Sequence, residues 1–328
     1  MSPKAPNPAT RKRPPILSVS FFLACLVVSG LLFLSLVTGQ YDVFGQADGA
    51  DIFAITRIPR TLALILAGAA MAMSGLVMQM LTQNRFVEPS TTGTTEWASL
   101  GLLFMLYFFP AANILQQMAA AVTFAFIGSM VFFLFLRRIS LRSSLIVPLV
   151  GIMLGAVISA FTTFFALQTN LLQSLGVWMA GSFTSVIQGQ YEVLWLVLLV
   201  LALIFYYADR LTLAGLGQDT ATSLGLNYSQ ILLIGTALIA MASGVVTVVV
   251  GSLPFVGLIV PNLVSLWRGD DLRSNLPWVA LTGIALVTVC DLLGRTLIAP
   301  FEIPVSVILG MVGAVLFIGM ILKGRARA

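Results

Sequence analysis

The stretch ILLIGTALIAMASGVVTVVV, residues 231–250, contains no charged side chain in twenty consecutive positions. As an α-helix this stretch would be about 30 Å long, which matches the hydrocarbon core of a bilayer. Its polar and apolar residues do not alternate, as they would in a strand of a transmembrane barrel. The stretch therefore predicts a helix that crosses a membrane.

The rest of the chain has the same character. Of its 328 residues, 59% are hydrophobic and 9% are charged, and the mean hydropathy is +1.03, whereas soluble domains carry about 25% charged residues. We expect an all-α polytopic membrane protein of about ten transmembrane helices in a single domain, residues 16–323. The apolar runs lie at 16–38, 60–82, 97–109, 114–136, 144–168, 191–208, 229–250, 254–267, 277–298 and 305–322. The third and eighth runs are short and would need support from neighbouring helices.

The basic residues orient these spans. Loops on the cytoplasmic side of a membrane carry an excess of Lys and Arg. With the N-terminus inside and ten crossings, fourteen of the seventeen basic residues fall inside, and only Arg57, Arg60 and Arg295 fall outside. We therefore expect cytoplasmic tails at 1–15 and 324–328, with 209–228 as the longest internal connection. The first run, 16–38, follows a basic tail but is too long for the apolar region of a signal peptide, so we interpret it as a retained helix.

The residue inventory limits the chemistry. The chain has no histidine, the commonest metal ligand and general base, and none of its three lysines follows a glycine-rich loop that could hold ATP. Its two cysteines, Cys25 and Cys290, lie in apolar runs and are interpreted as small core residues. We expect no catalytic residue, no metal site, no cofactor bound by this chain and no nucleic-acid partner.

Several dispersed motifs carry a family resemblance. They are RIPR at 57–60, NRF at 84–86 with Glu88-Pro89, LGQDTATSLGL at 216–226, FVGLIVPN at 255–262, DLLGR at 291–295 and EIPV at 302–305. In this order and spacing they resemble the permeases of ABC importers for iron-siderophores and vitamin B12 (FecCD-like), over about 16–323. Two departures are Asn262, where many members have His, and the replacement of the usual small residues by TTEW at 94–97. EPSTTGTTEWASLG at 88–101 and VPNLVSLWRGDD at 260–271 look like the subgroup for catecholate-type siderophores such as anguibactin, petrobactin and enterobactin.

The resemblance implies a type II ABC importer permease in a bacterial cytoplasmic (inner) membrane. Its partners would be membrane lipid, a second permease (we favour a heterodimer), two ATPase subunits that bind ATP and Mg²⁺, and an extracytoplasmic substrate-binding protein. The cargo would be ferric siderophore. Heme or cobalamin are alternative cargoes, and an ion-coupled secondary transporter is the competing class.

The three external arginines are the expected docking residues for the binding protein. Family members present arginines here to glutamates of that protein, and guanidinium groups pair well with carboxylates. The alternative is that Arg57, Arg60 and Arg295 reach toward lipid phosphates. Asp291 lies within the ninth span, four residues before Arg295 on the same helical face. We interpret Asp291 as the partner of Arg295 in a structural intramembrane pair, with proton or cation handling as the alternative.

Two further sets of residues follow from the resemblance. The segment 217–226 resembles a coupling helix that sits in a groove of the ATPase, with a plain amphipathic loop helix as the alternative; its candidate residues are Gln218, Asp219, Ala221, Thr222, Ser223, Leu224 and Gly225. The fifth and tenth spans of the family line the translocation path. Candidate path or gate residues are Ser143, Ser144, Thr162, Thr163 and Gln168, although a helix cap or hydrogen bonds to neighbouring helices would also account for them.

Overall fold

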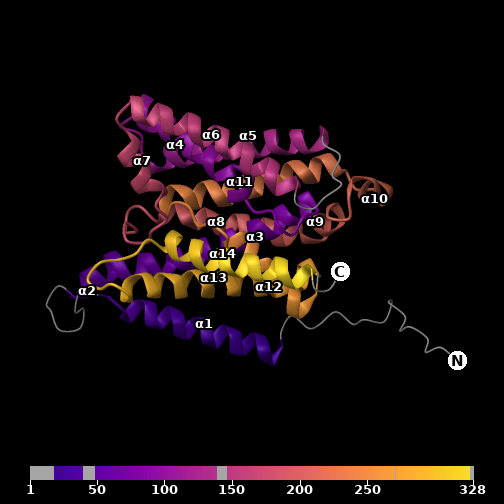
Figure 1. Cartoon of the computed structure of the whole chain (residues 1–328). Helices are drawn as coiled ribbons and strands as arrows, with labels where there is room; N and C mark the ends of the chain where they lie inside the picture. Colours follow the sequence, from indigo (N-terminus) through magenta and orange to yellow (C-terminus); the bar gives the residue numbers. More distant parts are fainter. Residues whose placement is uncertain (1–17, 40–48, 139–145, 270, 326–328) are drawn as a thin grey trace.

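The computed structural model describes residues 18–39, 49–138, 146–269 and 271–325 and shows a bundle of long, roughly parallel helices (Figure 1). The elements are α1 (Val19–Val37), α2 (Gly49–Ile52), a π-helical turn η2 (Phe53–Arg57), α3 (Ile58–Thr82), a 3₁₀ turn η3 (Ser90–Thr92), α4 (Thr94–Phe108), α5 (Ile114–Arg138), α6 (Ile146–Gln168), α7 (Leu172–Met179), a 3₁₀ turn η4 (Glu192–Trp195), α8 (Leu196–Tyr206), α9 (Ala208–Ala214), α10 (Gln218–Ser223), α11 (Tyr228–Val249), α12 (Val256–Arg268), α13 (Leu272–Thr296) and α14 (Val305–Arg325).

The all-α membrane fold expected from the sequence is confirmed. Each of the ten predicted spans coincides with a described helix: α1, α3, α4, α5, α6, α8, α11, α12, α13 and α14. Among the described residues, six helical segments are long and apolar enough to cross a membrane alone. A seventh candidate span is the pair formed by η4 with α8 and by α9, which are bent by 62° relative to each other. Helices α3 and α11 lie in the core, whereas α1 and α6 expose most of their apolar side chains.

The two short predicted spans are short helices in the structure. Helices α4 and α12 have 15 and 13 residues, or about 22 and 20 Å, less than the thickness of a bilayer core. The start of α12 is buried, and the carboxylate of Glu88 accepts hydrogen bonds from the backbone N–H groups of Phe255 (2.8 Å) and Leu258 (3.1 Å). A remote side chain therefore satisfies the amides that a longer helix would have paired itself.

The predicted start of the second span, at residue 60, is wrong. The helix begins at Gly49 and continues through η2 into α3 as far as Thr82. Pro59 has no N–H to donate to the carbonyl of Ile55, and Gln188 donates its backbone N–H to that carbonyl instead, at 3.0 Å. Because a neighbouring loop satisfies the free carbonyl, Arg57 and Arg60 lie within a continuous helix and not before it.

Other boundaries also shift. Helix α13 begins at Leu272, five residues before the predicted span, and α14 continues to Arg325, two residues into the predicted tail. The connection 169–190 contains the short helix α7, which the sequence analysis did not predict.

Glycines let α3 approach its neighbours closely. A Cβ atom added to Gly75 would lie 2.1 Å from the carbonyl oxygen of Gly257 on α12, and one added to Gly68 would lie 2.9 Å from the carbonyl oxygen of Gly283 on α13. Displacement of either backbone would cost packing free energy, since both belong to packed helices. Small residues at such crossings are typical of helix packing in membranes.

We expect Gly75→Ala to destabilise the protein by about 3 kcal/mol, because the methyl group would force two helix backbones apart. Thermal unfolding of the detergent-solubilised protein measures this loss. Gly30→Ala is the matched control: it is also a helical glycine, but a Cβ there would meet nothing within 4 Å. Equal melting temperatures for the two variants would contradict the close approach.

Candidate functional site

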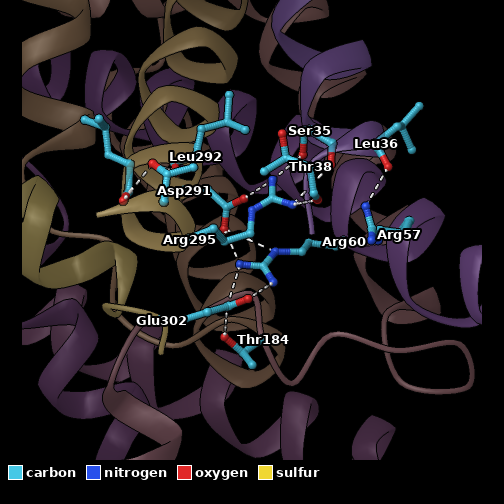
Figure 2. Close-up of polar contacts among 12 residues, drawn as sticks. Ser35, Leu36, Thr38, Arg57, Arg60, Thr184, Asp291, Leu292, Arg295 and Glu302 are labelled. Carbon is cyan, nitrogen blue, oxygen red and sulfur yellow. Dashed lines mark hydrogen bonds and ion pairs between the residues drawn. The ribbon is translucent and has the colours of Figure 1, made fainter. Parts of the chain in front are cut away.

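The three arginines that the sequence placed outside lie together at one end of the bundle. Arg57 ends η2, Arg60 lies in the first turn of α3, and Arg295 lies in the last turn of α13. Figure 1 shows α2 and α7 at this end and α10 at the opposite end. Figure 2 shows Arg60 between the carboxylates of Asp291 and Glu302, Arg295 beside Asp291, and Arg57 apart from both carboxylates, directed to the carbonyl of Leu36.

Asp291 is the centre of the cluster. Its side chain has no exposed surface, Arg60 Nη2 lies 2.7 Å from its Oδ1, and Arg295 Nη2 lies 2.7 Å from its Oδ2. The pair with Arg295 has the geometry expected from the four-residue spacing. The pair with Arg60 joins residues 231 positions apart, and sequence spacing gave no indication of it. One buried carboxylate therefore pairs with Arg295 within α13 and, through Arg60, holds α3 against α13.

Arg57 and Arg295 also hold the end of α1. Arg57 Nη1 donates to the carbonyls of Leu36 (3.0 Å) and Val37 (2.9 Å). Arg295 Nη1 donates to the carbonyls of Ser35 and Thr38, and its Nη2 donates to Ser35 Oγ. The last carbonyls of a helix have no partner within the helix and carry partial negative charge. Two guanidinium groups therefore satisfy the end of α1 and fix it against α3 and α13.

Glu302, in the connection between α13 and α14, completes the cluster. Its carboxylate accepts two hydrogen bonds from Arg60, at 3.1 and 2.9 Å, and one from Thr184 Oγ1 at 2.6 Å. Burial alone would raise the pKa of Glu302, but the bonds from Arg60 and Thr184 and the charges of Arg60 and Arg295 outweigh it, so its pKa lies below the ordinary value. Glu302 is therefore ionised at neutral pH.

A pocket of about 220 Å³ opens at this cluster. All three arginines line it, together with Glu302, Thr184 and neighbouring residues. Three guanidinium groups and two carboxylates give the cluster a net charge of about +1 at neutral pH, although only Arg60 and Arg295 pair with the carboxylates. An anionic group is the ligand that this pocket would favour. The use of the arginines for docking stays a prediction.

The predicted coupling residues lie at the opposite end. Gln218, Asp219, Ala221, Thr222 and Ser223 form α10, followed by Leu224 and Gly225. Ala221 is buried, and the other predicted coupling residues are exposed. Gly225 has φ +82°, and a side chain there would meet nothing within 4 Å. This short helix therefore stands free at the end of the molecule (Figure 1).

Of the predicted path residues, the structure describes Thr162, Thr163 and Gln168, all on α6. Ser143 and Ser144 lie outside the described residues. Thr162 is buried, and its hydroxyl donates to the carbonyl of Ile158 in its own helix at 2.8 Å. Thr163 and Gln168 are exposed on α6. Their role in a translocation path stays a prediction.

The sequence analysis missed three contributors. Glu302 was noted only as part of the EIPV motif, and its position directly before an apolar span was the available signal. Thr184 and the α12-capping Glu88 carried no local signal of their role. The part of the chain that the structure describes holds no cluster of three His, Cys, Asp or Glu residues that could bind a metal ion, and we assign no metal site.

The comparisons with known proteins fit this architecture. The model of the FecCD transport family matches residues 16–323, nearly the whole chain. The chain belongs to the FecCD transport family.

Individual relatives agree with the family. The chain is 61% identical to the petrobactin import system permease protein FatD of Bacillus anthracis, over 93% of this chain and 91% of the relative. It is 41% identical to the ferric-anguibactin transport system permease protein FatD of Vibrio anguillarum, over 82% and 86%. The vitamin B12 import system permease protein BtuC of Escherichia coli is 32% identical, over 93% and 95%.

A solved structure has the same fold. It is described as an inward-facing conformation of a metal-chelate type ABC transporter and superposes with a TM-score of 0.80 at 26% identity, over 93% of this chain and 99% of that chain. The chain therefore combines a FecCD-type helix bundle with an arginine cluster (Arg57, Arg60 and Arg295) at one end of it.

We expect Asp291→Ala to destabilise this FecCD-family chain by about 3–5 kcal/mol, because it leaves two buried guanidinium groups without their shared carboxylate. Thermal and denaturant unfolding in detergent measure the loss. Asp209→Asn is the matched control, since it breaks the exposed pair with Arg273, and exposed pairs contribute about 0–1 kcal/mol. If the two variants lose the same stability, Asp291 is not the centre of the cluster.

Proposed function

We propose that this chain is the membrane-spanning permease of an ATP-driven importer that takes up ferric siderophore of the petrobactin and anguibactin type. The observation that carries the proposal is the 61% identity to a petrobactin import permease across 93% of the chain. Iron would pass while enclosed in its chelator, so the permease itself needs no iron ligands. The permease is a transport subunit, and ATP and Mg²⁺ would bind to partner subunits.

The arginine pocket supports docking of a binding protein on the external face. Its net charge of about +1 suits one carboxylate of a partner, and guanidinium groups recognise carboxylates with defined geometry. Charges at the rim of an interface mainly increase association rate and fix register. Each permease of a pair would offer one such pocket, so a two-lobed binding protein could be oriented by both.

Helix α10 supports docking of the ATPases on the cytoplasmic face. It is exposed, short and at the far end from the arginine pocket, as a coupling helix must be. Two ATPase subunits would engage α10 of this chain and of a second permease. We propose a heterodimer, because the catecholate systems that this sequence resembles commonly use two different permeases. Both termini would be cytoplasmic.

Two other functions have weaker support. Cobalamin as cargo rests on 32% identity to BtuC, against 61% and 41% for the siderophore permeases. An ion-coupled transporter needs an ionisable group available within the membrane. Asp291, the residue considered for that role, is paired on both oxygens with arginines.

Uptake of labelled iron tests the proposal. We expect cells that lack their own petrobactin permease to regain uptake of ⁵⁵Fe-petrobactin when they express this chain with the permease, binding-protein and ATPase genes beside it. Labelled cyanocobalamin is the control cargo and should not accumulate. Uptake that persists without the ATPase gene, or accumulation of cobalamin in place of petrobactin, would contradict the proposal.

Replacement of Gly225 tests the coupling helix. We expect Gly225→Leu to reduce uptake severely while membrane insertion and basal ATP hydrolysis persist, because a bulky side chain would disturb the docked surface and strain a left-handed residue by about 1–2 kcal/mol. Gly189→Leu is the matched control: Gly189 also has positive φ and open space around it, but it follows Gln188, which bonds to Ile55 of η2 at the other end. If both variants transport equally, α10 does not contact the ATPase at Gly225.

A further inference from the structure

Most N–H donors of Arg60 and Arg295 are used within the chain; the Nε of Arg295 is buried and has no hydrogen-bond partner among the described residues. A guanidinium group has five N–H donors. Arg60 directs Nε and Nη2 to Asp291, and Nη1 and Nη2 to Glu302. Arg295 directs Nη1 to two carbonyls of α1 and Nη2 to Ser35 and Asp291. Neither group can offer two parallel donors to an incoming carboxylate unless a present partner leaves.

Glu302 is the partner that can leave. Asp291 has no exposed surface, whereas the side chain of Glu302 is 25% exposed. Glu302 lines the 220 Å³ pocket, and Asp291 does not. Glu302 also lies outside any helix, on the connection between α13 and α14, where a side chain can turn away without breaking helical hydrogen bonds. When Glu302 leaves Arg60, Arg60 stays paired with Asp291.

We propose that Glu302 is an internal substitute for a carboxylate of the docking partner, which replaces Glu302 on Arg60 when the binding protein arrives. The inference rests on the proposed function, because it names how that protein engages the pocket. The incoming carboxylate takes the two donors that Glu302 occupies, and Glu302 turns out into water with its charge intact. Glu302 therefore occupies these donors of Arg60 until a stronger or better-placed carboxylate displaces it.

The exchange affects the start of α14. Glu302 lies three residues before α14 begins at Val305, so its bonds to Arg60 tie α3 to the entry of α14. Docking at Arg60 and this tie exclude each other. The connection keeps its backbone bond from Ile303 N–H to the carbonyl of Gly294 and the bonds of Ser306 to residues 180 and 181. Docking thus releases one side-chain tie of α14 while the backbone contacts remain.

Binding measurements with the assembled transporter in nanodiscs test the exchange. Glu302→Gln keeps the shape but loses the charge, and charge-assisted hydrogen bonds are roughly twice as strong as neutral ones. The weakened competitor should tighten binding of the binding protein encoded beside the permease by about three- to tenfold. Thr184→Val, which removes one hydrogen bond from Glu302 and no charge, should tighten binding by a smaller factor.

Glu192→Gln is the matched control. Glu192 is another carboxylate at this end of the chain and accepts a bond from the backbone of Gly189, but no bond to the arginines is seen for it among the described residues. It tests whether any loss of negative charge at this end tightens docking. An equal effect of Glu192→Gln and Glu302→Gln, or unchanged or weaker binding with Glu302→Gln, would overturn the exchange. Absence of binding to the unmodified transporter would instead overturn the proposed docking itself.

A spin label gives an independent measurement. Phe301, beside Glu302, is 73% exposed, and Phe301→Cys can carry the label in a chain whose Cys25 and Cys290 are replaced by Ala. Addition of the binding protein should increase label mobility, and Glu302→Gln should show the higher mobility before any addition. A label whose mobility is the same in all four samples would contradict the release of Glu302.

Discussion

A carboxylate with no access to water lies between two arginines at one end of the bundle, and the arrangement of the helices there depends on it. An isolated ionised Asp291 would be very costly at this position. Its pairing with Arg60 persists only while α3 and α13 stay in register, since a shift between the two helices would separate these groups, whereas its pairing with Arg295 lies within α13. Arg295 in turn satisfies carbonyls at the end of α1. The first, second and ninth predicted spans are therefore positioned by one set of charges.

A second buried carboxylate, that of Glu88, also fixes the position of a helix inside the bundle. Glu88 is almost fully buried and accepts hydrogen bonds at the start of α12 and from Ser90. Without it the short helix α12 would begin in an apolar region with free amides. Asp291 and Glu88 thus stabilise a backbone arrangement that differs from a series of full-length membrane-spanning helices. The glycine contacts of α3 with α12 and α13 provide the close packing that keeps these groups in place.

Much of the fold could be predicted from the sequence because membrane helices are long apolar runs of a length set by the bilayer. The number and order of the spans and the two short ones follow from local patterns, and the short exposed helix α10 lies in the segment that the family resemblance singled out. The start of the second span could not be predicted, because the Ile55 carbonyl left free by Pro59 is satisfied by a loop more than a hundred residues away. For the same reason, the sequence predicted only one of the two ion pairs that Asp291 makes. The spacing of Asp291 and Arg295 is local, but the pairing of Arg60 with Asp291 and Glu302 depends on which helices pack together.

The two ends of the molecule are joined by the most buried helices. Helix α10 leads within a few residues into α11, whose first turn is capped by Asn227, and α11 packs against α3. Helix α3 carries Arg60 in its first turn and Gly75 at the crossing with α12 further along. Because α11 contacts both α10 and α3, one packed helix lies between the end that carries α10 and the helix that carries Arg60. The packing of α3 against α11 and α13 therefore fixes the position of Arg60 relative to Asp291.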